Sequence, residues 1–211
     1  MNSKVRDRSE TELSVRKKEF LKICDILENL NINFFLQTGI LLGAIRENDL
    51  IKWDWDIEIS VFESDFFPKI DLVAEELKKN NFKVEKISKK AKESKIDFIG
   101  TYPKEVTGYT IFSWNYSKIN NHYWRKGFIV PSKFLNKFTK INFLGRKFNC
   151  PYNPEEYLKY AYGDWKKPLR TSNKDVYFSK KFKSKKNFII NNFKNYILNV
   201  LYNFLKYFRK N

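Results

Sequence analysis

The sequence predicts an α+β fold in which a mixed β-sheet is flanked by helices. Three observations favour this class: a long amphipathic pattern opens the chain, short apolar runs with strand character follow, and these runs are interspersed with helical patterns in an irregular order. Such an order favours a mixed sheet over a doubly wound parallel one. With 211 residues, 42% of them hydrophobic, the chain can bury the core of one large domain.

The first expected element is a helix from about Thr11 to Leu30. Ser9 followed by Glu12 has the spacing of a capping box, which marks a helix N-terminus. The apolar residues that follow recur at helical intervals: Leu13, Phe20, Ile23, Cys24, Leu27 and Leu30. This stripe predicts that one side of the helix packs on the rest of the domain.

A strand, a tight turn and a short helix are expected next. Residues 33–37 form a short apolar run, residues 38–39 mark the turn, and residues 40–46 have helical character. A second strand is expected over residues 57–61. An amphipathic helix over residues 64–79 follows it.

Further strands and one helix complete the predicted domain. Three apolar runs have strand character, at residues 82–87, 96–99 and 109–114. A hairpin around Gly145 is expected over residues 140–150. Pro154 begins a helix that Gly163 ends. The compact domain is expected to cover residues 1–169.

The composition changes after this point, so residues 170–211 are expected to form a basic tail. They hold eleven Lys or Arg residues and a single acid. Their apolar residues fall on one helical face: Ile189, Phe193, Ile197, Val200, Leu201, Phe204, Leu205 and Phe208. We expect a basic amphipathic helix that contacts an anionic membrane surface or a second copy of the chain through residues 187–209. Packing on the domain and contact with nucleic acid are the alternatives.

The net charge of +17 indicates an anionic partner, but does not choose between a phospholipid surface, a phosphorylated substrate and nucleic acid. Cys24 and Cys150 belong to no Cys/His cluster, which argues against a disulfide framework and a zinc site. The first residues lack a signal-peptide pattern, and no uncharged apolar stretch of about 18 residues occurs. We therefore expect a cytoplasmic protein, with peripheral contact at the inner face of the membrane.

The stretch from Gln37 to Glu58 contains the residues that point to chemistry. If a strand begins near Asp54, then Asp54, Asp56 and Glu58 share one face, and their carboxylates repel one another unless a cation lies between them. Mg²⁺ or Mn²⁺, which prefers oxygen ligands, fits this arrangement. Just upstream, the chain passes through Gly39 into a helix whose free N–H groups attract phosphate. Phosphoryl or nucleotidyl transfer requires carboxylates that bind a metal ion beside a site that binds an anion.

The same stretch resembles the signature of the LicD/fukutin family of nucleotidyltransferase-fold phosphotransferases. The match consists of G-I-L-L-G-A-I-R at residues 39–46 and W-D-W-D-I-E at residues 53–58. Two positions depart from the family pattern. Ile40 stands where the family usually has Thr, and Glu58 stands where it usually has a third Asp.

The resemblance continues downstream. K-I-D-F-I at residues 95–99 is similar to a later strand of the family that carries a single Asp, here Asp97. Y-G-D-W-K-K-P at residues 162–168 looks like the family's closing segment, so the resemblance covers about residues 31–168. It implies a nucleotidyltransferase-like mixed sheet flanked by helices.

The resemblance also implies an activity. Members of this family transfer a phospho-alcohol or phospho-polyol group, of the phosphocholine or ribitol-phosphate type, from a CDP-linked donor. The implied acceptor is the hydroxyl of a glycan or lipid-linked glycan, CMP is released, and the product belongs to a cell-surface polysaccharide or glycolipid. Nucleic acid is not an expected partner.

The residues and the resemblance together assign roles. Asp54 and Asp56 would hold Mg²⁺ or Mn²⁺ against the diphosphate of the donor, with Glu58 as a further ligand. Because apolar residues flank Asp97, its carboxylate needs a partner, and it would join the metal shell or accept the proton of the attacking hydroxyl. A strand-edge acid paired with a lysine is the alternative for Asp97. The expected donor-binding residues are Gly39, Ile40, Gly43, Arg46 and Lys52.

Two other functions remain open at this stage. A nucleotidyltransferase that moves NMP from an NTP to a small molecule or an RNA end would keep the fold and change the reaction. A basic, non-enzymatic nucleic-acid-binding domain would explain the charge, although the acidic strand face would be an obstacle to it.

Overall fold

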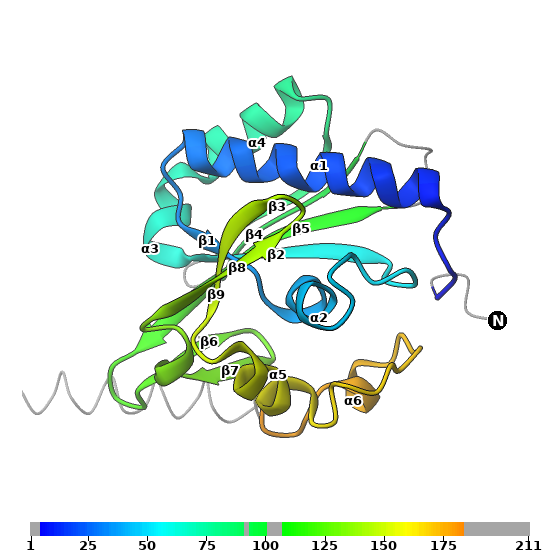
Figure 1. The fold of residues 1–211 in the computed structure, drawn as a ribbon. Helices are drawn as coiled ribbons and strands as arrows, with labels where there is room; N and C mark the ends of the chain where they lie inside the picture. The colour runs from blue at the N-terminus through cyan, green and yellow to red at the C-terminus, as the bar shows by residue number, and fades with distance from the viewer. Residues whose placement is uncertain (1–4, 91–92, 101–106, 184–211) are drawn as a thin grey trace, which may run out of the picture.

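The computed structural model of the protein describes residues 5–90, 93–100 and 107–183, and the structural statements below concern these residues. Figure 1 shows a twisted main sheet with helices on both of its sides. The predicted α+β class with a mixed sheet is confirmed. The helix predicted over residues 187–209 lies outside the described residues.

The sheet has the strand order β1-β2-β5-β4-β3, and the hairpin of β6 and β7 extends it from β5. Strands β2 and β5 run parallel, whereas the other neighbouring strands run antiparallel. The strand bounds are β1 Phe34–Phe35, β2 Asp56–Phe62, β3 Lys83–Lys90, β4 Glu93–Ile99, β5 Gly108–Ser117, β6 His122–Arg125 and β7 Phe128–Pro131.

Helices α1 (Glu10–Asn29) and α4 (Ile70–Lys79) lie together on one face of the sheet (Figure 1). The predicted cap of α1 is present, because the Ser9 hydroxyl accepts a hydrogen bond of 3.2 Å from the backbone N–H of Glu12. The apolar stripe of α1 faces the sheet, and its most buried members have no exposed surface: Phe20, Ile23, Cys24 and Leu27.

The helix predicted over residues 64–79 is divided into three parts. A short helix, α3 (Glu63–Phe66), is followed by a 3₁₀ turn at Phe67–Lys69 and then by α4. Pro68 lies in the 3₁₀ turn, where its ring and its missing N–H interrupt the α-helical hydrogen bonds.

The other side of the sheet carries α2 (Thr38–Arg46), α5 (Pro154–Tyr162) and α6 (Lys174–Tyr177), which Figure 1 shows below the strands. A separate hairpin of β8 (Phe138–Phe143) and β9 (Arg146–Pro151) leads into α5. The hairpin turns at Gly145, as predicted. A further 3₁₀ turn spans Ser132–Phe134.

Residues 170–183 pack on the domain instead of leaving it. Phe178 and Phe182 are 6% and 0% exposed, and their ring centroids lie 5.1 and 4.9 Å from that of Phe128. The N–H of Ile129 donates to the carbonyl of Phe182 at 3.0 Å. The folded domain therefore extends beyond the boundary predicted at residue 169, because buried aromatic rings anchor this basic segment.

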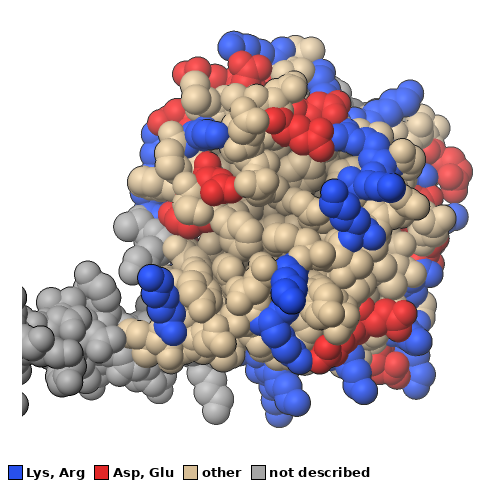
Figure 2. Space-filling view, turned by 60° about the vertical axis from the view of Figure 1, so that its left-hand side comes forward, with Lys and Arg blue, Asp and Glu red and all other residues tan. Residues whose placement is uncertain are grey.

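One face of the protein shows no surface feature that by itself selects a partner (Figure 2). On the face drawn in Figure 2, basic and acidic side chains are interspersed around a neutral centre and form no continuous positive stripe. None of the helices among the described residues has both the length and the apolar character needed to cross a bilayer.

Candidate active site

Three carboxylates at the start of β2 line a cavity of about 450 Å³ between β2, α2 and residues 162–178. Asp54, Asp56 and Glu58 are partly buried, whereas Ile57 and Ile59 on the opposite face are 3% and 1% exposed. The alternation expected from the sequence is therefore present from Asp56 to Ile59. Asp54 precedes the strand, and Trp53 and Trp55 line the cavity together with the acids.

Gly39, the second residue of α2, lies directly against the first of these acids. A Cβ atom at this position would overlap Oδ2 of Asp54, so a side chain here would displace the carboxylate. The glycine thus brings a carboxylate and the N-terminus of a helix into contact, which is the arrangement expected from the sequence.

Thr38 begins α2 with a positive φ of 52°, a rare conformation for a β-branched residue. It is 1% exposed, and its hydroxyl donates a hydrogen bond of 3.1 Å to Oε2 of Glu58. Sequence reasoning placed Thr38 in the turn but gave it no role at the site. Its position directly before Gly39 in a strand-to-helix turn was the available signal.

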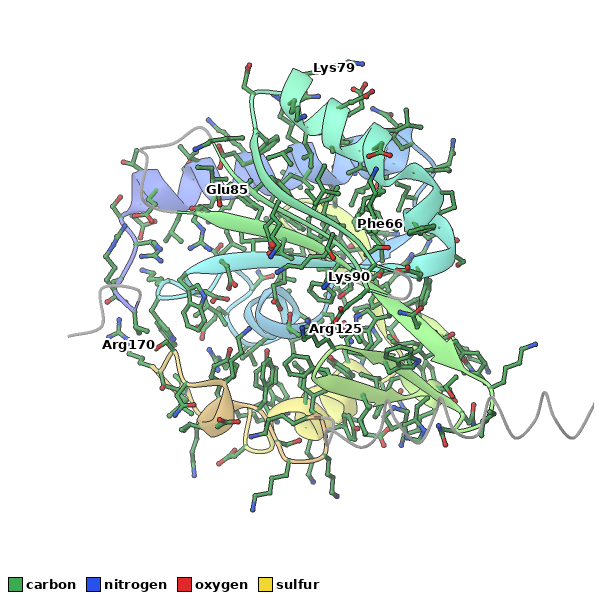
Figure 3. All side chains as sticks on the ribbon, turned by 180° about the vertical axis from the view of Figure 1, so that it is seen from behind. Phe66, Lys79, Glu85, Lys90, Arg125 and Arg170 are labelled. Atoms are coloured by element: carbon green, nitrogen blue, oxygen red, sulfur yellow. The ribbon has the colours of Figure 1, made fainter. Side chains whose placement is uncertain are left out.

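Arg125 belongs to β6 and is labelled in Figure 3. Its guanidinium lies 3.7 Å from Oε2 of Glu58. The same group lies over the rings of Phe112 and Phe128, 3.8 and 4.3 Å from their centroids. Burial lowers the pKa of Arg125. Glu58 is therefore engaged by Thr38 and Arg125, and nothing in the sequence near β6 indicated this contact.

The remaining two acids lie where their surroundings disfavour the ionised form. Burial raises the pKa of both Asp54 and Asp56, and the nearby Glu58 carboxylate raises both further. Arg16, on α1, lowers both pKa values but does not offset the burial. Because ionising this pair is unfavourable without a positive charge beside it, the donor set fits a hard divalent cation.

Among the described residues, no three His, Cys, Asp or Glu side chains converge on a point where they could hold a metal ion. Asp54 and Asp56 alone would supply the protein ligands. This number suits Mg²⁺, which is commonly bound by one or two carboxylates together with phosphate oxygens and water.

Asp97 lies on β4, outside the cavity lining. In the sheet it pairs with Thr110 of β5, which in turn pairs with Glu58 of β2, so Asp97 and Glu58 face the same side with one strand between them. Two strand spacings amount to about 10 Å. The Asp97 carboxylate accepts a hydrogen bond of 2.9 Å from Thr110 Oγ1 and pairs with Lys95 Nζ at 2.8 Å. This lysine pairing is the alternative that the sequence left open, and a catalytic role for Asp97 stays a prediction.

The predicted donor-binding residues divide into two groups. Gly39, Ile40 and Arg46 line the cavity, and Arg46 also donates to the carbonyl of Trp165 at 3.1 Å. Gly43 and Lys52 do not line it. A Cβ on Gly43 would lie 2.5 Å from the carbonyl oxygen of Asp49, so this glycine permits close packing. Lys52 is largely exposed and pairs with Glu10 at 3.3 Å.

Half of the cavity lining comes from residues 162–178. Four of these eleven lining residues are aromatic. Tyr177 meets Trp55 edge-on at 6.4 Å and stacks on Tyr162 at 6.3 Å, measured between ring centroids. The guanidinium of Arg170 lies 4.9 Å from the centroid of the Trp53 ring. Two lysines also line this wall, Lys167 and Lys174. The cavity therefore combines an acidic side, aromatic walls and several cations.

Comparison with known proteins identifies the family to which this chain belongs. The sequence model of the LicD/FKTN/FKRP nucleotidyltransferase domain matches residues 31–153. The chain belongs to this family. The match contains α2, the acids of β2 and Asp97, whereas the wall formed by residues 162–178 lies outside it.

Individual relatives are ribitol-phosphate transferases by name. The chain is 27% identical over 173 residues to ribitol-5-phosphate transferase FKTN of Mus musculus, an alignment that covers 74% of this chain and 34% of the relative. It is 35% identical over 43 residues to ribitol 5-phosphate transferase FKRP of Mus musculus and of Homo sapiens, covering 20% of this chain and 9% of each relative. The chain thus spans about a third or less of the relatives' lengths.

Proposed function

We propose that this protein is a divalent-cation-dependent transferase that moves a phospho-alcohol or phospho-polyol group from a CDP-linked donor to a glycan hydroxyl and releases CMP. The observation that carries the proposal is the contact between Asp54 and Gly39 in a cavity that Asp56 also lines. The pKa values of both acids stay raised despite the positive charge of Arg16. Membership in the LicD/FKTN/FKRP family and the names of the relatives support the class of reaction.

The cation site would consist of Asp54 and Asp56, with Mg²⁺ or Mn²⁺ as the ion. When bound, the ion supplies positive charge that offsets the diphosphate of the donor. Thr38 and Arg125 hold Glu58 beside the pair, where its charge strengthens the attraction for a cation. The transferred group is of the phosphocholine or ribitol-phosphate type.

The remaining cavity residues suit the rest of the donor. Arg46, Lys167 and Lys174 line the cavity and would pair with phosphate oxygens that the cation does not reach. Trp53 and Trp55 present rings on which a nucleobase can stack.

The acceptor hydroxyl would attack the phosphorus of the transferred group. A new O–P bond forms, the bond from that phosphorus to the oxygen of CMP breaks, and the hydroxyl proton passes to a base. Asp97 is our candidate for the base, because it faces the same side of the sheet as Glu58 and an acceptor lying across β5 would reach both. Its pairing with Lys95 would have to open in the complex.

The acceptor is proposed to be a glycan or lipid-linked glycan of a cell-surface polysaccharide or glycolipid. We propose a cytoplasmic location with peripheral contact at the inner face of the membrane, or a homo-oligomer, formed through residues 187–209. The support is the basic amphipathic sequence pattern of that segment. A truncation after Lys183, compared with the full chain for sedimentation with anionic vesicles and for mass in solution, tests both.

Product analysis tests the reaction itself. The purified protein is incubated with Mg²⁺, a glycan acceptor and CDP-choline, CDP-ribitol or CDP-glycerol in turn, and CMP is measured by chromatography. We expect CMP with one donor and none with the Asp54→Asn variant. Pyrophosphate release from an NTP would instead indicate nucleotidyl transfer. RNA binding that weakens steeply with salt, without either reaction, would indicate a nucleic-acid-binding domain.

A further inference from the structure

Arg16 lies outside the family match, yet it touches the backbone of both acids of the proposed cation site. It belongs to α1 and is 1% exposed. Its guanidinium donates from Nη1 to the carbonyl of Asp54 at 2.7 Å and from Nη2 to the carbonyl of Asp56 at 3.3 Å. One side chain therefore spans the two residues whose carboxylates line the cavity.

The pairing of the sheet explains why this contact is needed. Strand β5 pairs with β2 from Asp56 to Phe62, whereas β1, on the other side, pairs only with Ser60 and Val61. The start of β2 thus has a strand neighbour on one side alone. Arg16 supplies N–H donors to carbonyls there, as a neighbouring strand would do.

Arginine is suited to this task, because the planar guanidinium presents several N–H donors in a fixed fork. The carbonyls of Asp54, just before β2, and of Asp56, its first residue, both accept from this one fork. A lysine ammonium keeps the charge but does not provide the same pair of fixed donors. The contact therefore constrains the separation of two backbone positions, in addition to supplying positive charge.

We propose that Arg16 is a positioning residue that fixes the spacing of Asp54 and Asp56 and thereby sets the affinity of the site for its divalent cation. The inference rests on the proposed function, since it assumes that these two acids hold a cation. Two carboxylates bind one ion well only when their separation matches its coordination shell. Residues that orient metal ligands without touching the metal commonly change metal affinity about 10- to 100-fold when they are replaced.

A merely structural role is the competing explanation, because Arg16 also joins α1 to the sheet. Arg146 provides a matched control. It lies on β9 and joins that strand to α1 through Asp25 at 2.6 Å and Glu28 at 2.8 Å, and it does not line the cavity. Replacing Arg146 by Gln should weaken the attachment of α1 and leave the cation site intact.

The test compares full-length wild type, Arg16→Lys, Arg16→Gln and Arg146→Gln. Binding of Mn²⁺ alone is measured by electron paramagnetic resonance, folding by circular dichroism, and the KM for Mg²⁺ separately from kcat. We expect the two Arg16 variants to bind Mn²⁺ about 10- to 100-fold more weakly and to raise the KM for Mg²⁺ more than they lower kcat. Arg146→Gln should bind Mn²⁺ like the wild type.

Three results would overturn the inference: wild-type Mn²⁺ affinity in folded Arg16→Lys and Arg16→Gln, an equal loss of affinity in Arg146→Gln, or failure of both Arg16 variants to fold, which would assign Arg16 a structural role. Failure of the proposed function is recognised separately. In that case the wild-type protein itself neither binds Mn²⁺ nor releases CMP from any CDP-linked donor.

Discussion

The carboxylate of Asp54 packs against the α-carbon of Gly39, so closely that even a methyl group on Gly39 would overlap it. Gly39 belongs to α2, and Asp54 lies 15 residues later, just before β2. Their contact places a negatively charged ligand beside the N-terminus of a helix, where phosphate is also attracted. A cation held by Asp54 would therefore lie where it can bind a phosphate oxygen.

Replacing Gly39 by Ala should reduce turnover on the order of 100-fold, because the added methyl group displaces Asp54 by a fraction of an ångström or more. Steady-state kinetics of CMP release measures the effect. Gly108→Ala is the control, since a Cβ on Gly108 meets nothing within 4 Å although Gly108 pairs with Asp56 in the sheet. Equal activity of the Gly39 and Gly108 variants would show that the contact is unimportant.

Replacing Asp54 or Asp56 by Asn should reduce turnover at least about 100-fold and should not destabilise the metal-free protein. The substitution removes a carboxylate whose pKa is raised by burial and by the neighbouring acids, so one source of instability disappears. Activity assays and thermal unfolding measure both effects. Asp71→Asn, which alters an exposed acid paired with Lys89, should leave turnover unchanged. An inactive variant that is also unfolded would not support the assignment.

The metal-free protein should lose stability as the pH rises. Burial and the neighbouring acids raise the pKa of Asp54 to about 6 and that of Asp56 to about 8, whereas carboxyls in the unfolded chain release their protons near pH 4. Between about pH 4 and pH 8 the folded state therefore binds more protons than the unfolded chain. The stability that the protonated acids contribute at low pH is lost as the pH rises through about 6 for Asp54 and about 8 for Asp56.

Thermal unfolding of EDTA-treated protein across this range measures the effect. Adding Mg²⁺ should raise the Tm most at the upper end, where both acids are ionised and available as ligands. The variant with both acids replaced by Asn should show a shallower pH dependence. An identical slope in this variant and in the wild type would mean that other groups cause the loss.

Replacing Asp97 by Asn should reduce kcat about 100- to 10,000-fold if Asp97 is the base, with little effect on Mn²⁺ binding. The Asn side chain can keep the hydrogen bond from Thr110, so folding should be preserved. Lys95→Met removes the ion-pair partner and serves as the comparison. If both variants retain activity, Asp97 is a surface acid that pairs with a lysine and takes no part in the reaction.

Local sequence patterns predicted the elements whose cause is local. The cap of α1 depends on Ser9 and Glu12, which are three residues apart. The two faces at the start of β2 follow from the alternation of acidic and apolar residues from Asp56 to Ile59. The division of the helix over residues 64–79 was also visible in principle, because Pro68 is incompatible with an uninterrupted helix.

The parts of the site that sequence reasoning missed depend on contacts across the fold. Arg16 and Arg125 reach β2 from α1 and β6, and neither stands in a motif. The β6–β7 hairpin was missed because all four residues of β6 are of intermediate exposure, so they show no alternation. Residues 170–178 complete the cavity, yet their basic composition suggested a tail outside the domain.

The central claim is that Asp54 and Asp56 hold one divalent cation beside the start of α2. Crystals grown with Mn²⁺ and CDP, measured at a wavelength where manganese scatters anomalously, test it most directly. We predict an anomalous peak about 2.1 Å from a carboxylate oxygen of each of the two acids, with a phosphate oxygen of CDP completing the shell. A peak elsewhere, or CDP bound in the cavity without any peak at these two carboxylates, would contradict the account.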